Sequence, residues 1–125
     1  MINRRKIMAF FSTAALGLSF VAGSASADGH GGWTIGFSQD TMDHPWRAYM
    51  VTSAEAQAAK YPDIKEFIYT DAGGSNEKQI ADVEDLISRG VDLIMMSPRE
   101  AQALVPAVEA IKAAGIPLVV LDREI

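Results

Sequence analysis

The sequence contains no cysteine. This absence excludes disulfide bonds, thiolate-ligated metal ions and a lipid anchor attached through a cysteine. The sequence has two histidines among 125 residues, so it offers few imidazole ligands for a metal ion. Basic residues are also scarce, with 11 Lys and Arg against 16 Asp and Glu. This negative balance argues against a nucleic-acid partner and against an anionic membrane surface.

The first 27 residues have the features of a cleaved secretory signal peptide. Basic residues at positions 4–6 precede an uncharged apolar stretch over residues 7–22. Ala25 and Ala27 follow, and signal peptidase accepts small residues at this spacing. The apolar stretch is shorter than the roughly 20 residues that a transmembrane helix needs. We therefore expect residues 1–27 to be removed, by the general secretory route or by the twin-arginine route.

The rest of the chain is predicted to be an acidic protein of the bacterial periplasm. All 16 acidic residues follow the predicted signal peptide, whereas three of the 11 basic residues lie within it. An exported protein without a cysteine for lipidation has no membrane anchor after cleavage, and a second membrane is what would retain it near the cell. Residues 28–32 are polar and glycine-rich, so we expect them to be disordered.

Short apolar runs alternate with helical patterns over residues 33–125. The runs predict strands at 34–38, 66–71, 92–97 and 117–122. The third and fourth runs are continuous rather than alternating, as in strands of a parallel sheet that is covered on both faces. The alternation predicts right-handed βαβ crossovers and hence an α/β fold, a three-layer αβα arrangement with a parallel sheet.

Three helices are expected between the strands. The first runs from about Trp46 to Lys60 and follows Pro45. The second is predicted to begin with Asn76 as N-cap, with Gln79 at the spacing of a capping box. The third ends before Gly115 and begins only a few residues before Pro106, because proline would break a helix interior.

Polar and aromatic residues collect in two loops at the predicted carboxyl ends of the strands, where ligands bind in open α/β sheets. Trp46 and Arg47 stand at the first helix start, and Asp122 and Arg123 follow the fourth strand. An indole stacks on the C–H face of a sugar, while carboxylate and guanidinium groups hold its hydroxyls. Trp46 alone is equally compatible with a core anchor, and Asp122–Arg123 with a surface pair. Their convergence on one edge indicates a polyol site.

The residues of an enzyme or a metal site are not evident. A nucleotide-binding Rossmann enzyme would need a glycine-rich fingerprint after the first strand, and residues 39–45 contain no glycine. The segment DAGGSNEK matches no phosphate-binding motif and is interpreted as a turn with an N-cap. His44 has no second histidine over residues 33–125 and is expected to line the rim of the site. We predict no catalytic residue, cofactor or metal.

Three segments resemble the type I periplasmic binding proteins, the ribose- and galactose-binding group. WTIGFSQDTMDHPWRAYM is similar to the first strand, the aromatic loop and the first helix of that family. QIADVEDLISRGVDLIMMSP resembles the second helix and third strand, and AVEAIKAAGIPLVVLDREI the third helix and the strand that ends in a sugar-contacting Asp-Arg pair. Within the family, the combination of Ser38-Gln39 with Trp46-Arg47 is more similar to galactofuranose-binding than to ribose-binding members.

The resemblance implies a function and a set of ligand contacts. A monomeric protein of two lobes would close over a monosaccharide and dock on an ABC permease in the inner membrane. The ligand contacts would be Asp43, Trp46, Arg47, Asp122 and Arg123, with Gln39 as a further candidate. The family's length implies that residues 33–125 form part of the N-terminal lobe, without the hinge and the second lobe.

Two other functions use the same fold. An extracytoplasmic sensor could present a sugar or an autoinducer to a chemoreceptor or a histidine kinase. The effector domain of a LacI-type regulator is disfavoured by the predicted signal peptide and by the lack of a helix-turn-helix motif ahead of Trp33.

Overall fold

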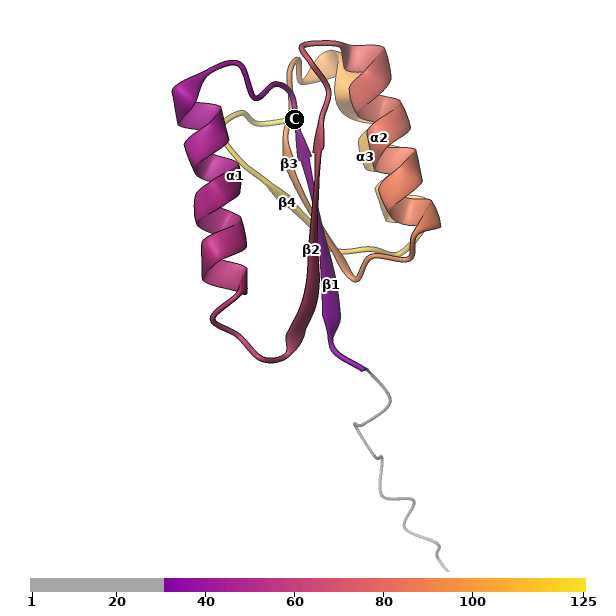
Figure 1. Cartoon of the computed structure of the whole chain (residues 1–125). Coiled ribbons are helices and arrows are strands. Elements are labelled where there is room, and N and C mark those ends of the chain that lie inside the picture. The colour runs from indigo at the N-terminus through magenta and orange to yellow at the C-terminus, as the bar shows by residue number, and fades with distance from the viewer. Residues whose placement is uncertain (1–30) are drawn as a thin grey trace, which may run out of the picture.

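The computed structural model describes residues 31–125 (Figure 1). The predicted signal peptide lies outside the described residues, as does the predicted disordered tail apart from Gly31 and Gly32. Within the described part of the chain, no helix is long and apolar enough to cross a membrane. The elements in chain order are β1 (Trp33–Gln39), α1 (Pro45–Ala58), β2 (Ile64–Asp71), α2 (Asn76–Ser88), β3 (Leu93–Ser97), a 3-10 turn (Gln102–Leu104), α3 (Val105–Ala113) and β4 (Leu118–Val120).

The four strands form one parallel sheet in the order β2-β1-β3-β4. Helix α1 covers one face of the sheet, and α2 and α3 cover the other (Figure 1). The predicted three-layer α/β fold is therefore confirmed. Strand β1 is central, with Phe37 opposite Tyr69 of β2 and Met95 of β3. Strand β4 lies at one edge of this sheet, where the side chain of Val119 is 42% exposed.

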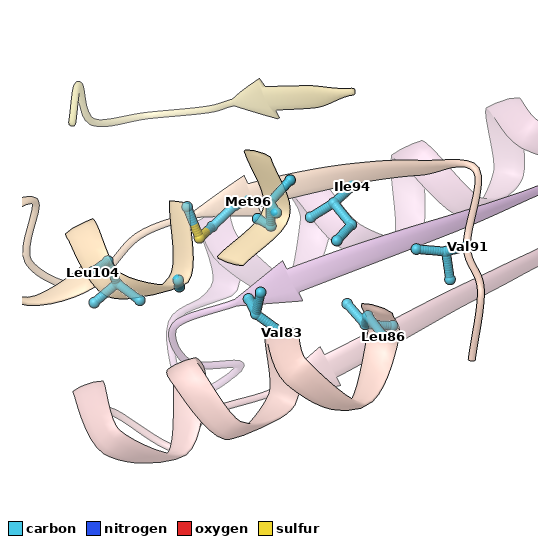
Figure 2. Packing of buried hydrophobic residues seen from close by; sticks show 8 residues of the cluster. Val83, Leu86, Val91, Ile94, Met96 and Leu104 are labelled. Carbon is cyan, nitrogen blue, oxygen red and sulfur yellow. The ribbon is translucent and has the colours of Figure 1, made fainter. Parts of the chain in front are cut away.

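The main apolar core lies between the sheet and the pair α2–α3 (Figure 2). Alternate residues of β3 point into it, and the helices contribute one stripe each, as expected for elements packed on one face of a sheet. Its buried members are Val83, Leu86, Val91, Ile94, Met96, Leu104, Ala107 and Ile111. The opposite face is packed more lightly, since Val51 and Ala58 are the buried residues of α1.

Helix α2 approaches the central strand most closely at Gly36. A Cβ atom at this position would lie 3.0 Å from Cδ2 and 3.1 Å from Cδ1 of Leu86. Leu86 is itself fully buried among its core neighbours, so it has little room to move. The absence of a side chain at Gly36 therefore sets how near α2 lies to the sheet.

The N-cap of helix α2 differs from the predicted one. Ser75, and not Asn76, is the N-cap of α2, and its hydroxyl accepts a hydrogen bond from the backbone N–H of Lys78 at 3.1 Å. The capping box predicted for Gln79 is wrong, because that side chain turns toward the sheet. The backbone N–H of Glu77 and the Ser75 hydroxyl bond to the Glu77 carboxylate and hold its pKa below the ordinary value.

The end of β4 also differs from the prediction. The strand stops at Val120 rather than at residue 122. Asp122 has a φ of 71°, the one positive φ of a non-glycine residue in the described chain. The N–H of Arg123 donates to the carbonyl of Leu121 at 2.8 Å. This three-residue bond with a positive central φ is a γ-turn of the rare, strained kind.

We predict that Gly36→Ala destabilises the protein by about 1–3 kcal/mol, because the new methyl group must displace Leu86 within a packed core. Gly31→Ala is the matched control, since nothing lies within 4 Å of a Cβ placed there. Urea unfolding followed by circular dichroism measures both. Equal midpoints for Gly36→Ala and wild type would mean that the core has room for the methyl group.

Candidate functional site

The site is built on the carboxyl ends of β1 and β3, beside the start of α1 (Figure 1). The end of β1 is polar yet buried, since Ser38 and Gln39 are 0% exposed and Asp40 is 2% exposed. Buried polar groups are costly unless they are paired. The partners that surround these residues therefore define the site.

Arg47, in the first turn of α1, is the centre of these contacts. Its Nη1 lies 2.9 Å from Asp40 Oδ1, and its Nη2 lies 3.3 Å from Asp122 Oδ2. Nη1 also donates to Ser97 Oγ at 3.1 Å and to Gln39 Oε1 at 3.4 Å. One guanidinium thus joins the ends of β1, β3 and β4, and its charge is compensated by two carboxylates.

Asp40 and Ser97 are site residues that the sequence analysis missed. The side chain of Asp40 is 3% exposed, and Oδ1 meets Arg47 as an ion pair without the geometry of a hydrogen bond. Asp40 lies two residues after the predicted strand 34–38 and directly follows β1, so its position near a strand end was the available signal. Ser97 likewise ends β3. Their pairing with Arg47 could not be read from spacing, because 50 residues separate Arg47 from Ser97.

The two residues of the predicted pair Asp122–Arg123 make different contacts. Asp122 faces Arg47, as the predicted convergence of the two loops requires. Its side chain remains 31% exposed, so part of it is open to solvent. Arg123 turns the other way, and its Nη1 donates to the carbonyl oxygens of Pro98 and Arg99. It therefore holds the loop after β3 in this structure.

Trp46 and Asp43 lie at the exposed rim. Trp46 is 60% exposed, so the alternative that it anchors the core is wrong. The backbone N–H of Trp46 donates to Nδ1 of His44, the N-cap of α1. Asp43 is exposed in the loop, where its N–H donates to Thr41 Oγ1 at 3.2 Å. Of the six predicted site residues, Gln39, Arg47 and Asp122 form one contact group, and the other three surround or extend it.

The arrangement offers hydrogen-bond acceptors and an exposed aromatic face. Over residues 31–125, no three His, Cys, Asp or Glu residues are grouped as they would be to hold a metal ion. A hollow of about 360 Å³ lies elsewhere, between α3 and the start of β4, and none of the predicted site residues lines it. The carboxyl edge thus presents a buried, charge-compensated guanidinium, a partly exposed carboxylate and an exposed indole.

The comparisons with known proteins agree with this geometry. Residues 35–125 match the family model described as periplasmic binding protein domain. The chain therefore belongs to the periplasmic binding protein family. This is a family of binding proteins and not of enzymes.

Individual relatives are sugar-binding or solute-binding proteins. The ribose import binding protein RbsB of Bacillus subtilis is 37% identical over 91 residues, which are 73% of this chain and 29% of that protein. The galactofuranose-binding protein YtfQ of Escherichia coli is 34% identical over 92 residues, which are 74% of this chain and 28% of that one. A solved ABC transporter solute-binding protein of Mycobacterium smegmatis, with bound glycerol, is 38% identical with a TM-score of 0.71, covering 76% and 32%.

These matches confirm the predicted family and fold, and they do not determine a ligand. The identities to the ribose and galactofuranose relatives are similar, so they do not single out one ligand. The chain spans less than a third of the length of either relative.

We predict that Arg47→Met destabilises the protein by about 3–5 kcal/mol, because it leaves the buried Asp40 carboxylate without its cation. The double variant Asp40→Asn with Arg47→Met should recover much of this loss, which a thermodynamic cycle from urea unfolding measures. Arg89→Met is the control, since it breaks the exposed pair with Asp85 and should cost less than about 1 kcal/mol. Strictly additive effects of the two substitutions would contradict the coupling.

Proposed function

We propose that the complete protein is the substrate-binding component of an ABC importer and that it captures a monosaccharide, a pentose or hexose that includes furanose forms. The observation that carries this proposal is the charge-compensated Arg47 between Asp40 and Asp122, at the edge where Trp46 is exposed. The names of the relatives, which concern ribose, galactofuranose and ABC transport, support it.

The physical reason lies in the charge of the site. Arg47 is paired with two carboxylates, so it presents no net positive charge to an anionic ligand. The exposed part of Asp122 can accept hydrogen bonds from neighbouring hydroxyls, as carboxylates do in paired, directional contacts. The exposed indole of Trp46 supplies a flat apolar surface for the C–H groups of a ring. A neutral polyol satisfies both surfaces at once.

We propose that binding involves the closure of two lobes, with residues 33–125 forming part of the first. The greater length of the relatives supports this, since the matched residues are 29% of RbsB from Bacillus subtilis. Ligand sites between two domains are common because closure removes water from both sides of the ligand. The second lobe would supply the remaining contacts to the sugar, and the closed form would dock on the permease.

The test is a thermal-shift assay on the complete gene product after its endogenous ligand has been removed. D-ribose, L-arabinose, D-galactose, D-xylose and myo-inositol are added in turn. Binding at about 100 times Kd should raise the Tm by roughly 5–10 °C for one of them. Trp46→Ala and Asp122→Ala should abolish the shift, because they remove the stacking face and the hydroxyl acceptor.

Tyr61→Ala is the matched control for the loss of an exposed aromatic residue. Tyr61 is 53% exposed and lies between α1 and β2, away from the carboxyl edge. Its substitution should leave the shift intact. A protein that responds to no compound of the panel would sink the proposal of a monosaccharide receptor.

We also propose that the protein is periplasmic and that export removes residues 1–27. The family supports the location, and the basic, apolar and small-residue segments of the sequence support the cleavage. Osmotic-shock release followed by mass spectrometry should give a mature chain that begins at Asp28. Recovery of the chain in the cytoplasm with residues 1–27 still attached would contradict this prediction.

A further inference from the structure

Gln79 is a buried polar side chain that none of the predicted ligand contacts includes. It lies in the first turns of α2 and is 0% exposed. Its Nε2 donates to the carbonyl of Ser97 at 2.9 Å and to Ser38 Oγ at 3.3 Å. Its Oε1 accepts from the N–H of Arg99 at 3.0 Å. One amide therefore joins the ends of β1 and β3 and the loop that follows β3.

The chemistry of these partners requires an amide at this position. A carbonyl can only accept a hydrogen bond and a backbone N–H can only donate one, so Ser97 and Arg99 need a donor and an acceptor side by side. An apolar side chain of the same shape would leave both groups buried and unpaired, which is costly. A glutamate would keep the acceptor for Arg99 but would lose the donor for Ser97 when it is ionised.

The partners of Gln79 are also the partners of Arg47. Ser97 accepts from Gln79 through its carbonyl and from Arg47 through its hydroxyl. Ser38, which Gln79 holds, directly precedes Gln39, and Gln39 Oε1 accepts from Arg47 as well. A change in the separation of the two strand ends would therefore move two acceptors of the guanidinium. Gln79 itself has no exposed surface through which it could touch a ligand.

We propose that Gln79 is a positioning residue of the ligand site: it fixes the ends of β1 and β3 and thereby the orientation of the Arg47 guanidinium and of its partner Asp122. This inference rests on the proposed function for its effect on ligand affinity. Its effect on Arg47 is independent of any ligand.

The first measurement uses the complete gene product without ligand. Side-chain ¹H–¹⁵N resonances of Arg47 report the hydrogen bonds of its guanidinium and are identified by their loss in Arg47→Met. Gln79→Met should shift these resonances. Gln79→Glu, which keeps the shape and one acceptor, should also shift them and serves if the methionine variant does not fold. Ile111→Ala, a core substitution in α3 and thus outside the helix that carries Gln79, should lower the Tm but leave the resonances in place.

The second measurement is calorimetric titration with D-ribose, L-arabinose, D-galactose and myo-inositol, well below the Tm of each variant. Gln79→Met should bind the compound that the wild type binds about tenfold more weakly, as expected for displaced hydrogen bonds. Ile111→Ala should bind it as the wild type does, which separates positioning from general stability.

The outcomes distinguish the two proposals. Unchanged Arg47 resonances in both Gln79 variants overturn the inference, as does a shift of the resonances without any loss of affinity. A wild-type protein that binds none of the four compounds counts against the proposed function. In that case the Arg47 resonances alone still decide whether Gln79 positions the guanidinium.

Discussion

The burial of a polar strand end is the constraint on which the rest of the carboxyl edge depends. Strand β1 is hydrogen-bonded on both sides, and its last residues continue into Asp40 without reaching solvent. Each of these polar side chains needs a partner. Arg47 comes from α1, Gln79 from α2 and Ser97 from β3. The elements of the fold are therefore tied together at the same place where the candidate site lies.

The two faces of the sheet are stabilised in different ways. The face under α2 and α3 is an apolar core, and a glycine in β1 lets α2 approach closely. Helix α1 buries little, but its first turn is held by the ion pairs of Arg47. An ion pair that is largely buried stabilises the structure less than an apolar core of the same size, while the loss of one partner is costly. The residues beside the proposed ligand thus lie on the helix that depends most on polar contacts.

The fold could be predicted from the sequence because its signals are local. Continuous apolar runs identify β3 and β4, and glycines with positive φ follow α2 and α3 at Gly90 and Gly115. The start of α2 was misplaced by one residue, because Ser75 and Asn76 are both good N-caps and the backbone decides between them.

Some residues of the site could be predicted from the sequence and others could not, and the difference has a physical cause. Arg47 and Asp122 were predicted to converge because both follow strand ends on one edge, and their ion pair agrees with this. Asp40 and Gln79 were not identified, since a carboxylate in a loop and a glutamine in a helix are usually exposed. Their burial results from the tertiary pairing of segments that are far apart in the sequence. The helical pattern does place Gln79 on the inward face of α2, four residues before Val83 and seven before Leu86, but it does not show which groups the amide meets there.

The backbone at Asp122 narrows which residues this position can hold. The turn at Asp122 is strained, and glycine, asparagine and aspartate enter positive φ more readily than other residues do. Of these three, aspartate alone brings the negative charge that Arg47 faces. The backbone conformation and the charge of Arg47 each restrict this position, and aspartate is the residue type that meets both requirements. Trp46 is under no such double demand, because it lies in an ordinary helical turn with its side chain in solvent. In proteins that share this lobe, changes of ligand preference should therefore come from substitutions at exposed positions such as Trp46, while the position of Asp122 keeps its aspartate.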